Sequence, residues 1–145
     1  MNSNIVIACN LAPSDPSVAL GFEAWIDDRK FFDSDHVQTA QQLCVEISDD
    51  QGEHELKFVM KNKTAEHTKV DEAGNIVSDA RLIITDLSLD ELLLAQIFID
   101  KSTYTHDFNG NGPATVEKFY GEMGCNGTVS LKFNTPVYLW LLENY

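Results

Sequence analysis

Basic residues are scarce in this sequence. Its 145 residues include 10 Lys and Arg against 23 Asp and Glu, which gives a formal net charge of -13. Residues 1–100 hold 19 of the acidic and 7 of the basic residues. A surface of this sign repels nucleic acid and anionic membranes, so we expect neither as a partner. The excess of acid agrees with a solvated surface or with binding of a divalent cation.

Cysteine and long apolar runs are also scarce. Cys9, Cys44 and Cys125 are odd in number and match no zinc-ligand spacing, so we expect no disulfide framework. No apolar run reaches the roughly 20 residues that span a bilayer. The N-terminal segment has no basic region and only a short apolar run, unlike a signal peptide. These features predict no membrane span and leave the compartment open.

Alternation of apolar and polar residues recurs along the chain. Between residues 55 and 61, for example, Leu56, Phe58 and Met60 alternate with polar residues. This is the period of a strand with one buried face. Turn signals separate such segments about every 8–12 residues, and no amphipathic helix longer than two turns is evident. The sequence therefore predicts an all-β protein, a jelly-roll-like antiparallel β-sandwich that forms a single domain over residues 1–145.

The pattern predicts where the strands and turns fall. Strands are expected at 4–9, 18–26, 30–32, 43–47, 55–61, 82–89, 93–100, 116–120, 128–133 and 137–142. Residues 33–36 are expected to form a turn, and residues 101–113 a long polar loop. The pattern at residues 37–42 is ambiguous, and a short helix is one alternative there. Leu82 and Ile84 would share one face and Leu87 and Leu89 the other, so the switch at Thr85 and Asp86 predicts a bulge or a bend.

Three segments resemble small carbohydrate-binding modules. SVALGFEAWIDDRKFFDS (residues 17–34) is similar to one of their strands with its return. GEHELKFVMKN (52–62) and SDARLIITDLSLDEL (78–92) resemble two strands of the calcium-dependent xylan-binding modules. The resemblance covers residues 18–92. It implies a β-sandwich with a polysaccharide or glycan as its ligand.

The same resemblance implies a calcium site, but this sequence departs from the family's pattern of calcium ligands. Asn62 and Asp79 stand at matching positions, but Lys63 replaces an Asp that is a calcium ligand in the family, and residues 80–81 also differ. Asp71, in the loop between, offers another carboxylate. At most a weak calcium site is therefore expected, at Asn62, Asp71 and Asp79. The segment DFNGNG (107–112) begins like a calcium loop but lacks its closing Glu, so it is the second choice.

The loop at 101–113 combines an aromatic ring with groups that bind hydroxyls. Its candidate ligand-binding residues are Tyr104, His106, Asp107, Asn109 and Asn111. Sugar binding uses an aromatic face for the C–H side of a pyranose and planar amides or carboxylates for its hydroxyls. Tyr104 would be the exposed platform, and Phe108 would hold the loop to the core. The alternative is a connection whose aromatics seal the end of the sandwich. If Tyr104 is buried, the binding face moves to Trp25, which shares the polar face of the strand at 18–26 with Glu23.

No catalytic arrangement is evident, so we do not expect an enzyme. The four histidines do not cluster, and nothing places a nucleophile beside a base. His54 is expected to be a structural histidine with its ring nitrogens satisfied. The favoured function is a non-catalytic binding module for a carbohydrate.

A second function from another class remains open. FYGEMGCNGTVSLKFNTPVYLWLLENY (119–145) resembles uncharacterised small proteins of marine bacteriophages and environmental sequences. This resemblance implies a structural or assembly protein, in a virion or outside the cell, that binds another protein or a second copy of itself.

Overall fold

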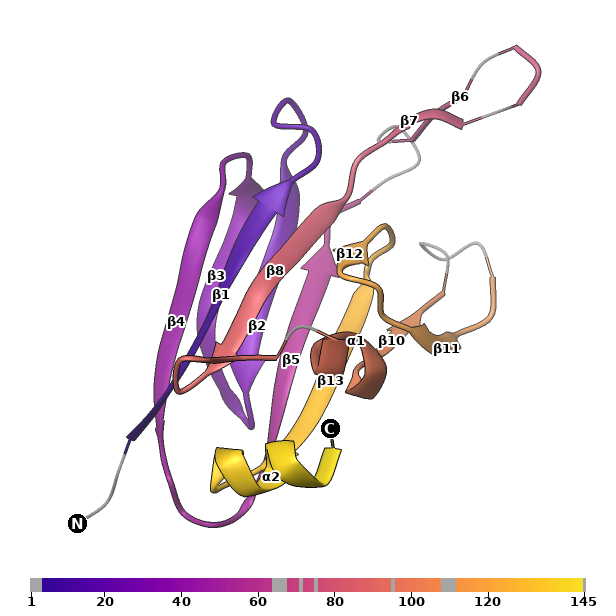
Figure 1. The fold of residues 1–145 in the computed structure, drawn as a ribbon. Helices are drawn as coiled ribbons and strands as arrows, with labels where there is room; N and C mark the ends of the chain where they lie inside the picture. Colours follow the sequence, from indigo (N-terminus) through magenta and orange to yellow (C-terminus); the bar gives the residue numbers. More distant parts are fainter. Residues whose placement is uncertain are drawn as a thin grey trace.

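Two antiparallel sheets form the body of the protein, as the computed structural model shows (Figure 1). It describes residues 4–63, 68–70, 72–74, 76–94, 96–107 and 112–144, with only the backbone of 68–70 and 76–79. The five-stranded sheet runs β12 (Glu122–Met123), β8 (Leu82–Leu89), β1 (Asn4–Pro13) and β4 (Gln41–Ser48), with β9 (Leu92–Leu93) also paired to β8. The six-stranded sheet runs β11 (Thr115–Lys118), β10 (Thr103–His106), β13 (Gly127–Asn134), β5 (Glu53–Lys61), β2 (Leu20–Ile26) and β3 (Arg29–Val37). The expected antiparallel β-sandwich is confirmed.

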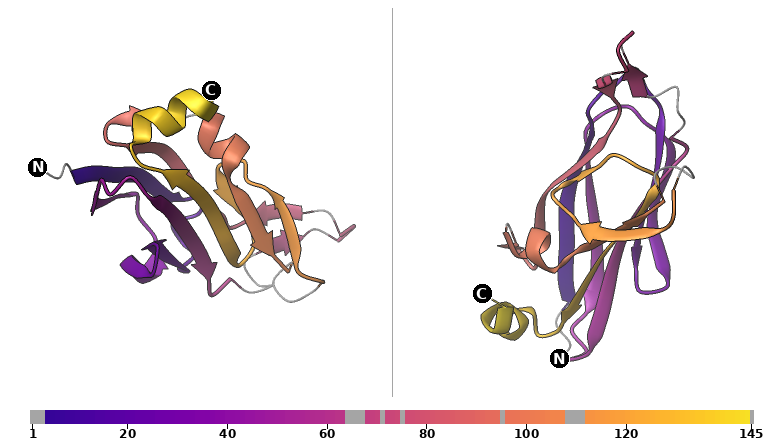
Figure 2. Two further views of the ribbon diagram at one scale, coloured as in Figure 1. Left: turned by 90° about the horizontal axis from the view of Figure 1, so that it is seen from below. Right: turned by 90° about the vertical axis from the view of Figure 1, so that its right-hand side faces the viewer.

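Three smaller features complete the fold. The strands β6 (Thr68–Val70) and β7 (Ile76–Asp79) pair in a separate hairpin that projects from one end of the sandwich (Figure 1). The helix α2 (Val137–Asn144) lies at the opposite end (Figure 2). The helix α1 (Gln96–Lys101) follows β9. Neither helix has the length and apolar character needed to cross a bilayer.

The core lies between the inner faces of the two sheets. In β5 the alternate residues Leu56, Phe58 and Met60 are buried, as the sequence predicts. The ring of Phe58 stacks on Phe22 of β2 at a centroid distance of 5.8 Å. The side chains between these buried residues point outward, so the six-stranded sheet has one dry and one wet face.

A β-bulge shapes β8. Its pairing with β1 shifts register, since Ala8 lies opposite Ser88 and Asn10 opposite Thr85. Asp86 has a φ of 56° at this place. The expected bulge is confirmed, but the expected change of face is wrong: the four residues Leu82, Ile84, Leu87 and Leu89 are all buried. The extra residue restores the inward direction after the interruption.

The structure corrects two of the expected strands. Residues 93–100 contribute only to β9 and then form α1, and residues 137–142 lie in α2. In α2 the buried residues Val137, Trp140 and Leu141 follow a helical spacing. The carbonyl of Pro136 accepts a hydrogen bond from the N–H of Trp140 at 3.3 Å. Short apolar runs fit a helix and a strand equally well, and the proline before α2 favours a helix start.

Other boundaries also differ from the sequence prediction. Residues 33–36 belong to β3 rather than to a turn, and Gln41 already begins β4, so residues 37–42 contain no helix. The expected loop at 101–113 begins with β10, a strand paired on both sides in the six-stranded sheet. The cysteines are free, with Cys9 buried and Cys44 exposed.

Candidate functional site

Tyr104 is part of the core rather than an exposed platform. Its side chain is only 7% exposed. The hydroxyl donates to the carbonyl of Cys125 and accepts from the N–H of Cys125 at 2.9 Å. Its ring meets Phe119 edge-on at 6.3 Å, and burial raises the pKa of its hydroxyl. The prediction that Tyr104 is an exposed platform on which a sugar stacks is wrong, because its side chain is almost wholly buried.

The other residues predicted with Tyr104 do not form a site around it. His106 is buried, and its Nε2 lies 2.8 Å from Glu117 Oε2. Asp107 is exposed, and its carbonyl accepts a hydrogen bond from the N–H of Gly112. Phe108, Asn109 and Asn111 lie outside the described residues. His106 as a sugar ligand is therefore wrong, since its side chain faces the interior.

The residues predicted to bind calcium are only partly described. The side-chain amide of Asn62 points to Asp35 Oδ1 at 3.4 Å. Asp71 lies outside the described residues, and Asp79 is described only as backbone in β7. Lys63 is buried and donates through its ammonium to the carbonyl of Gly124. No group of three or more His, Cys, Asp or Glu that could hold a metal occurs within the described part of the chain. The calcium site stays a prediction.

Trp25 lies on the outer face of the six-stranded sheet. Its neighbours in β2, Ala24 and Ile26, are buried in the core, so alternation turns the half-buried indole outward. Its Nε1 donates to Glu23 Oε1 at 2.9 Å. Lys30 of the adjacent strand β3 places its Nζ 5.7 Å from the centre of the indole ring. Trp25 is therefore an aromatic side chain fixed on an outward face.

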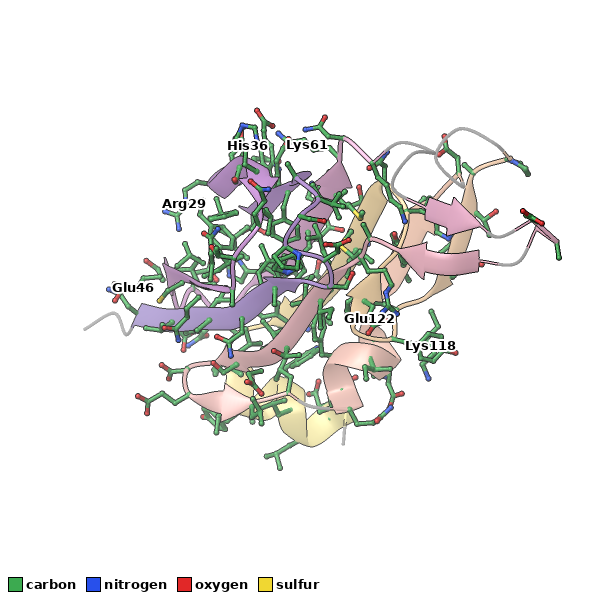
Figure 3. The ribbon with its side chains drawn as sticks, turned by 90° about the horizontal axis from the view of Figure 1, so that it is seen from above. Arg29, His36, Glu46, Lys61, Lys118 and Glu122 are labelled. Atoms are coloured by element: carbon green, nitrogen blue, oxygen red, sulfur yellow. The ribbon has the colours of Figure 1, made fainter. Side chains whose placement is uncertain are left out.

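Trp25 belongs to a closed ring of five side chains from three neighbouring strands. Lys30 Nζ lies 2.8 Å from Asp33 Oδ2, and Asp33 Oδ1 lies 2.8 Å from Lys61 Nζ. Lys61 Nζ returns to Glu23 Oε2 at 2.9 Å, which completes the ring through the indole. We call this set, Glu23, Trp25, Lys30, Asp33 and Lys61, the Trp25 ring. Lys61 lies at one edge of the view in Figure 3.

A glycine makes room for the central lysine of this ring. Gly21 of β2 lies directly opposite Lys61 of β5. A Cβ at Gly21 would come within 2.5 Å of the Cγ of Lys61 and 2.6 Å of the amide nitrogen of Asn62. Any other residue at position 21 would therefore displace the stem of Lys61. The absence of a side chain lets Lys61 cross its neighbour strand and reach Glu23 and Asp33.

The ring carries both signs of charge at neutral pH. The hydrogen bonds that Lys61 and then Trp25 donate lower the pKa of Glu23. Those donated by Lys30 and Lys61 lower the pKa of Asp33, and the same contacts raise the pKa of both lysines. The ring thus offers carboxylate acceptors and ammonium donors around one aromatic face. In a chain of net charge -13, this patch is close to neutral.

The outer face continues from Trp25 across the sheet. Cross-strand pairing aligns Trp25, Lys57, Ser130, Thr103 and Lys118 in one row. The next row holds Glu23, Val59, Thr128, Thr105 and Val116. Five strands about 4.8 Å apart give each row a length of about 19 Å. The surface is long, carries hydroxyl and ammonium groups, and has one large aromatic side chain near its end.

Sequence reasoning named Trp25 but missed its companions. Glu23 and Trp25 alternate outward on a strand the sequence does predict, and this pattern was the available signal. Lys30 and Asp33 were missed because residues 33–36 were expected to turn, whereas β3 carries Asp33 alongside β2. Lys61 was missed because its neighbours depend on the pairing of β5 with β2.

A second polar cluster lies at the end of the sandwich near α2. The ring of His54 stands between Asp27 Oδ2 at 2.8 Å and Asp50 Oδ1 at 2.9 Å. Asp50 also accepts a hydrogen bond from the hydroxyl of Thr135 at 3.2 Å. His54 is buried and stacks on Phe133. Both ring nitrogens are satisfied, which confirms the expected structural histidine.

Comparisons with known proteins add little to this description. No family model matches the chain, and no curated protein matches it significantly. One solved structure that matches is that of a C2 domain-containing protein, with 12% identity, 90% of this chain and 88% of that chain covered, and a TM-score of 0.28. A likeness this low supports no inference about function. Neither a carbohydrate-binding-module family nor a phage relative is shown, so the β-sandwich rests on the strand pairing above.

Proposed function

We propose that this protein is a non-catalytic binding module that recognises a polysaccharide or glycan chain on the outer face of its six-stranded sheet. The observation that carries the proposal is Trp25, an outward indole held by Glu23 within a ring of carboxylates and ammonium groups. The resemblance of residues 18–92 to carbohydrate-binding modules supports the same ligand class.

The chemistry of the face fits a neutral sugar. An indole presents a flat apolar surface to the C–H groups of a pyranose, and Lys30 in its exposed position can move to a sugar hydroxyl. Carboxylate oxygens of Glu23 and Asp33 accept hydrogen bonds from hydroxyls, and the ammonium of Lys57 donates to them. Because Lys61 already holds the carboxylates of Glu23 and Asp33, these two acceptors lose little side-chain freedom on binding.

Replacement of Trp25 tests the proposal. Affinity gels with xylan, galactan and cellulose, run with calcium and with chelator, should show retardation of the native protein by one of them. Trp25→Ala should weaken that binding by about 1–2 kcal/mol, or about tenfold, because the stacking surface is lost. Tryptophan fluorescence gives a second readout, since the other tryptophan, Trp140, is only 6% exposed and should not respond to sugar.

The matched control is an exposed aromatic elsewhere on the molecule. Tyr138 is 59% exposed and lies on α2, outside the six-stranded sheet, so Tyr138→Ala should bind sugar like the native protein. Circular dichroism should show that both variants fold. Absence of retardation on every glycan tested, with or without calcium, would reject the proposal. Equal loss in the Trp25 and Tyr138 variants would reject the assigned face.

A further inference from the structure

Two separate strands, β12 and β9, pair with the outer edge of β8. At its start, Leu82 and Ile83 pair with β12, and the N–H of Ile84 donates to the carbonyl of Gly121 at 2.9 Å. At its end, residues 88 and 89 pair with β9, and the carbonyl of Leu87 accepts a hydrogen bond from the N–H of Leu94 at 2.9 Å. Within the described residues, no strand pairs with Thr85 and Asp86 on that side. The edge of the five-stranded sheet is therefore interrupted at the bulge.

An apolar groove of about 500 Å³ lies at this interruption. Its apolar lining comes from β8, β9, α1 and the segment before β12, namely Ile83, Leu87, Leu93, Phe98, Ile99 and Tyr120. Leu93 is 53% and Tyr120 72% exposed. We call it the β8 groove. Figure 1 shows β12 and α1 beside β8. The groove thus combines a free stretch of strand edge with large apolar side chains in contact with water, as surfaces that accept an added strand do.

The groove is acidic as well as apolar. Its described lining includes Asp86 and Glu122 and contains no Lys, Arg or His, although Lys118 places its Nζ 5.6 Å from the centre of the Tyr120 ring. Glu122, which is labelled in Figure 3, pairs with Arg81 at 2.7 Å. Asp86 accepts a hydrogen bond from the neutral amide of Asn10 at 2.9 Å, so that contact leaves its negative charge uncompensated. The exposed Asp90 and Glu91 add further negative charge at the turn before β9.

We propose that the β8 groove binds a short extended segment of another protein in which apolar residues alternate with lysine or arginine. The apolar side chains would enter the groove, the backbone would lie along Thr85 and Asp86, and the cations would face Asp86, since Arg81 already pairs with Glu122. A second copy of this chain fits poorly, because its net charge of -13 would bring acid against acid. This surface is independent of the glycan face and gives the protein a second, protein-binding role.

Fluorescence anisotropy with synthetic peptides tests the proposal. The probes are fluorescein-labelled peptides of about nine residues in which Leu, Val, Ile or Phe alternate with Lys, the length needed to cross the gap and both flanking strands. One control set has Glu in place of Lys and another has Ser in place of the apolar residues. The Lys set should bind, with an affinity that falls as salt rises, and the two control sets should not.

Variants of the protein locate the site. Leu93→Ser and Tyr120→Ala should each weaken peptide binding about tenfold or more, because they remove exposed anchors. Asp86→Asn should reduce both the affinity and its salt dependence. Val116→Ser is the matched control, since Val116 is 65% exposed on β11 and does not line the groove, and it should bind like the native protein. Trp25→Ala should also leave peptide binding unchanged, which separates this result from the test of the glycan face.

Several outcomes would overturn the proposal. These are failure of every Lys peptide to bind, equal binding of the Glu peptides, and equal weakening by Val116→Ser. Light scattering adds another, because a dimer that dissociates on Tyr120→Ala would show that a second copy occupies the groove. Circular dichroism of each variant establishes that a loss of binding is not a loss of folding.

Discussion

His54 joins three turns at one end of the sandwich. Its ring contacts Asp27 in the turn between β2 and β3 and Asp50 in the turn between β4 and β5, and Asp50 in turn contacts Thr135 before α2. Burial disfavours the charged imidazole, but the hydrogen bonds and charges of Asp27 and Asp50 outweigh this and raise its pKa above 6.5. The hydrogen bond from His54 lowers the pKa of Asp50 below 3.8. The two shifts widen the pH range in which a charged His54 imidazolium pairs with the Asp50 carboxylate.

This cluster should make stability depend on pH. A raised pKa of His54 adds stability that is complete below pH 6.5, the ordinary value, and is lost as pH rises through the folded-state pKa. The lowered pKa of Asp50 adds stability that is present above pH 3.8 and is lost as pH falls through its folded-state value. The contribution is thus greatest between these two limits.

The prediction is checked by thermal melting of His54→Gln across the pH range. The variant should melt several degrees below the native protein at about pH 5.5, and the gap should shrink as pH rises through the folded-state pKa of His54. His36→Gln is the control, because His36 is exposed, and its melting should track the native protein at every pH. A gap for His54→Gln that stays constant with pH would contradict the ion-pair interpretation.

At the scale of elements, Tyr104 ties β10 to the segment between β12 and β13. Its hydroxyl serves both the N–H and the carbonyl of Cys125, so one side chain satisfies two backbone groups. The segment around Cys125 leads directly into β13, which pairs with β10 from Thr103 to His106. The residue expected to bind a ligand therefore holds two strands and their connection together.

Tyr104→Phe should destabilise the protein without affecting glycan binding. The ring remains, but the two hydrogen bonds between the hydroxyl and the backbone of Cys125 are lost, which costs about 1–3 kcal/mol. Urea denaturation measures the change in the free energy of unfolding. Tyr138→Phe, at an aromatic residue that is 59% exposed on α2, should change it by less than about 0.5 kcal/mol. Equal stability of Tyr104→Phe and the native protein would show that the hydroxyl contacts do not support the fold.

At the scale of the whole molecule, the net charge of -13 opposes the compact state. Like charges repel more weakly when salt screens them, with a Debye length of about 10 Å at 0.1 M. Exposed ion pairs such as Lys30 with Asp33 contribute little, so their screening should cost less than the repulsion it relieves.

Melting temperature should therefore rise with sodium chloride from low salt to about 0.5 M. Calcium chloride at equal ionic strength separates screening from binding. A larger rise in calcium that chelator reverses would support the site predicted at Asn62, Asp71 and Asp79, since a bound ligand stabilises the native state. A fall in melting temperature with sodium chloride would contradict the prediction and show that local ion pairs outweigh the net repulsion.

The strands that alternate strictly were predictable from the sequence. Leu56, Phe58 and Met60 identify β5, and the change of pattern at Thr85 and Asp86 identifies the bulge in β8, because period-2 burial is a local property of a strand. The segments of α1 and α2 contain only short apolar runs, which fit a helix and a strand equally well. Tertiary packing decided that these segments form helices, so the prediction of strands at 93–100 and 137–142 was wrong.

The candidate site was decided by tertiary structure. Sequence placed Trp25 on the outward face of a strand, and its own alternation was sufficient for that. It placed Tyr104 in a loop, because nothing local shows that Thr103–His106 pairs with β11 and β13 and so turns the Tyr104 ring inward. Lys61 meets Glu23 and Asp33 only because β5 lies beside β2 and β2 beside β3. Local sequence determines which side chains of a strand face the same way. Long-range strand pairing determines which of these side chains come into contact, because Lys61 is distant along the chain from both Glu23 and Asp33.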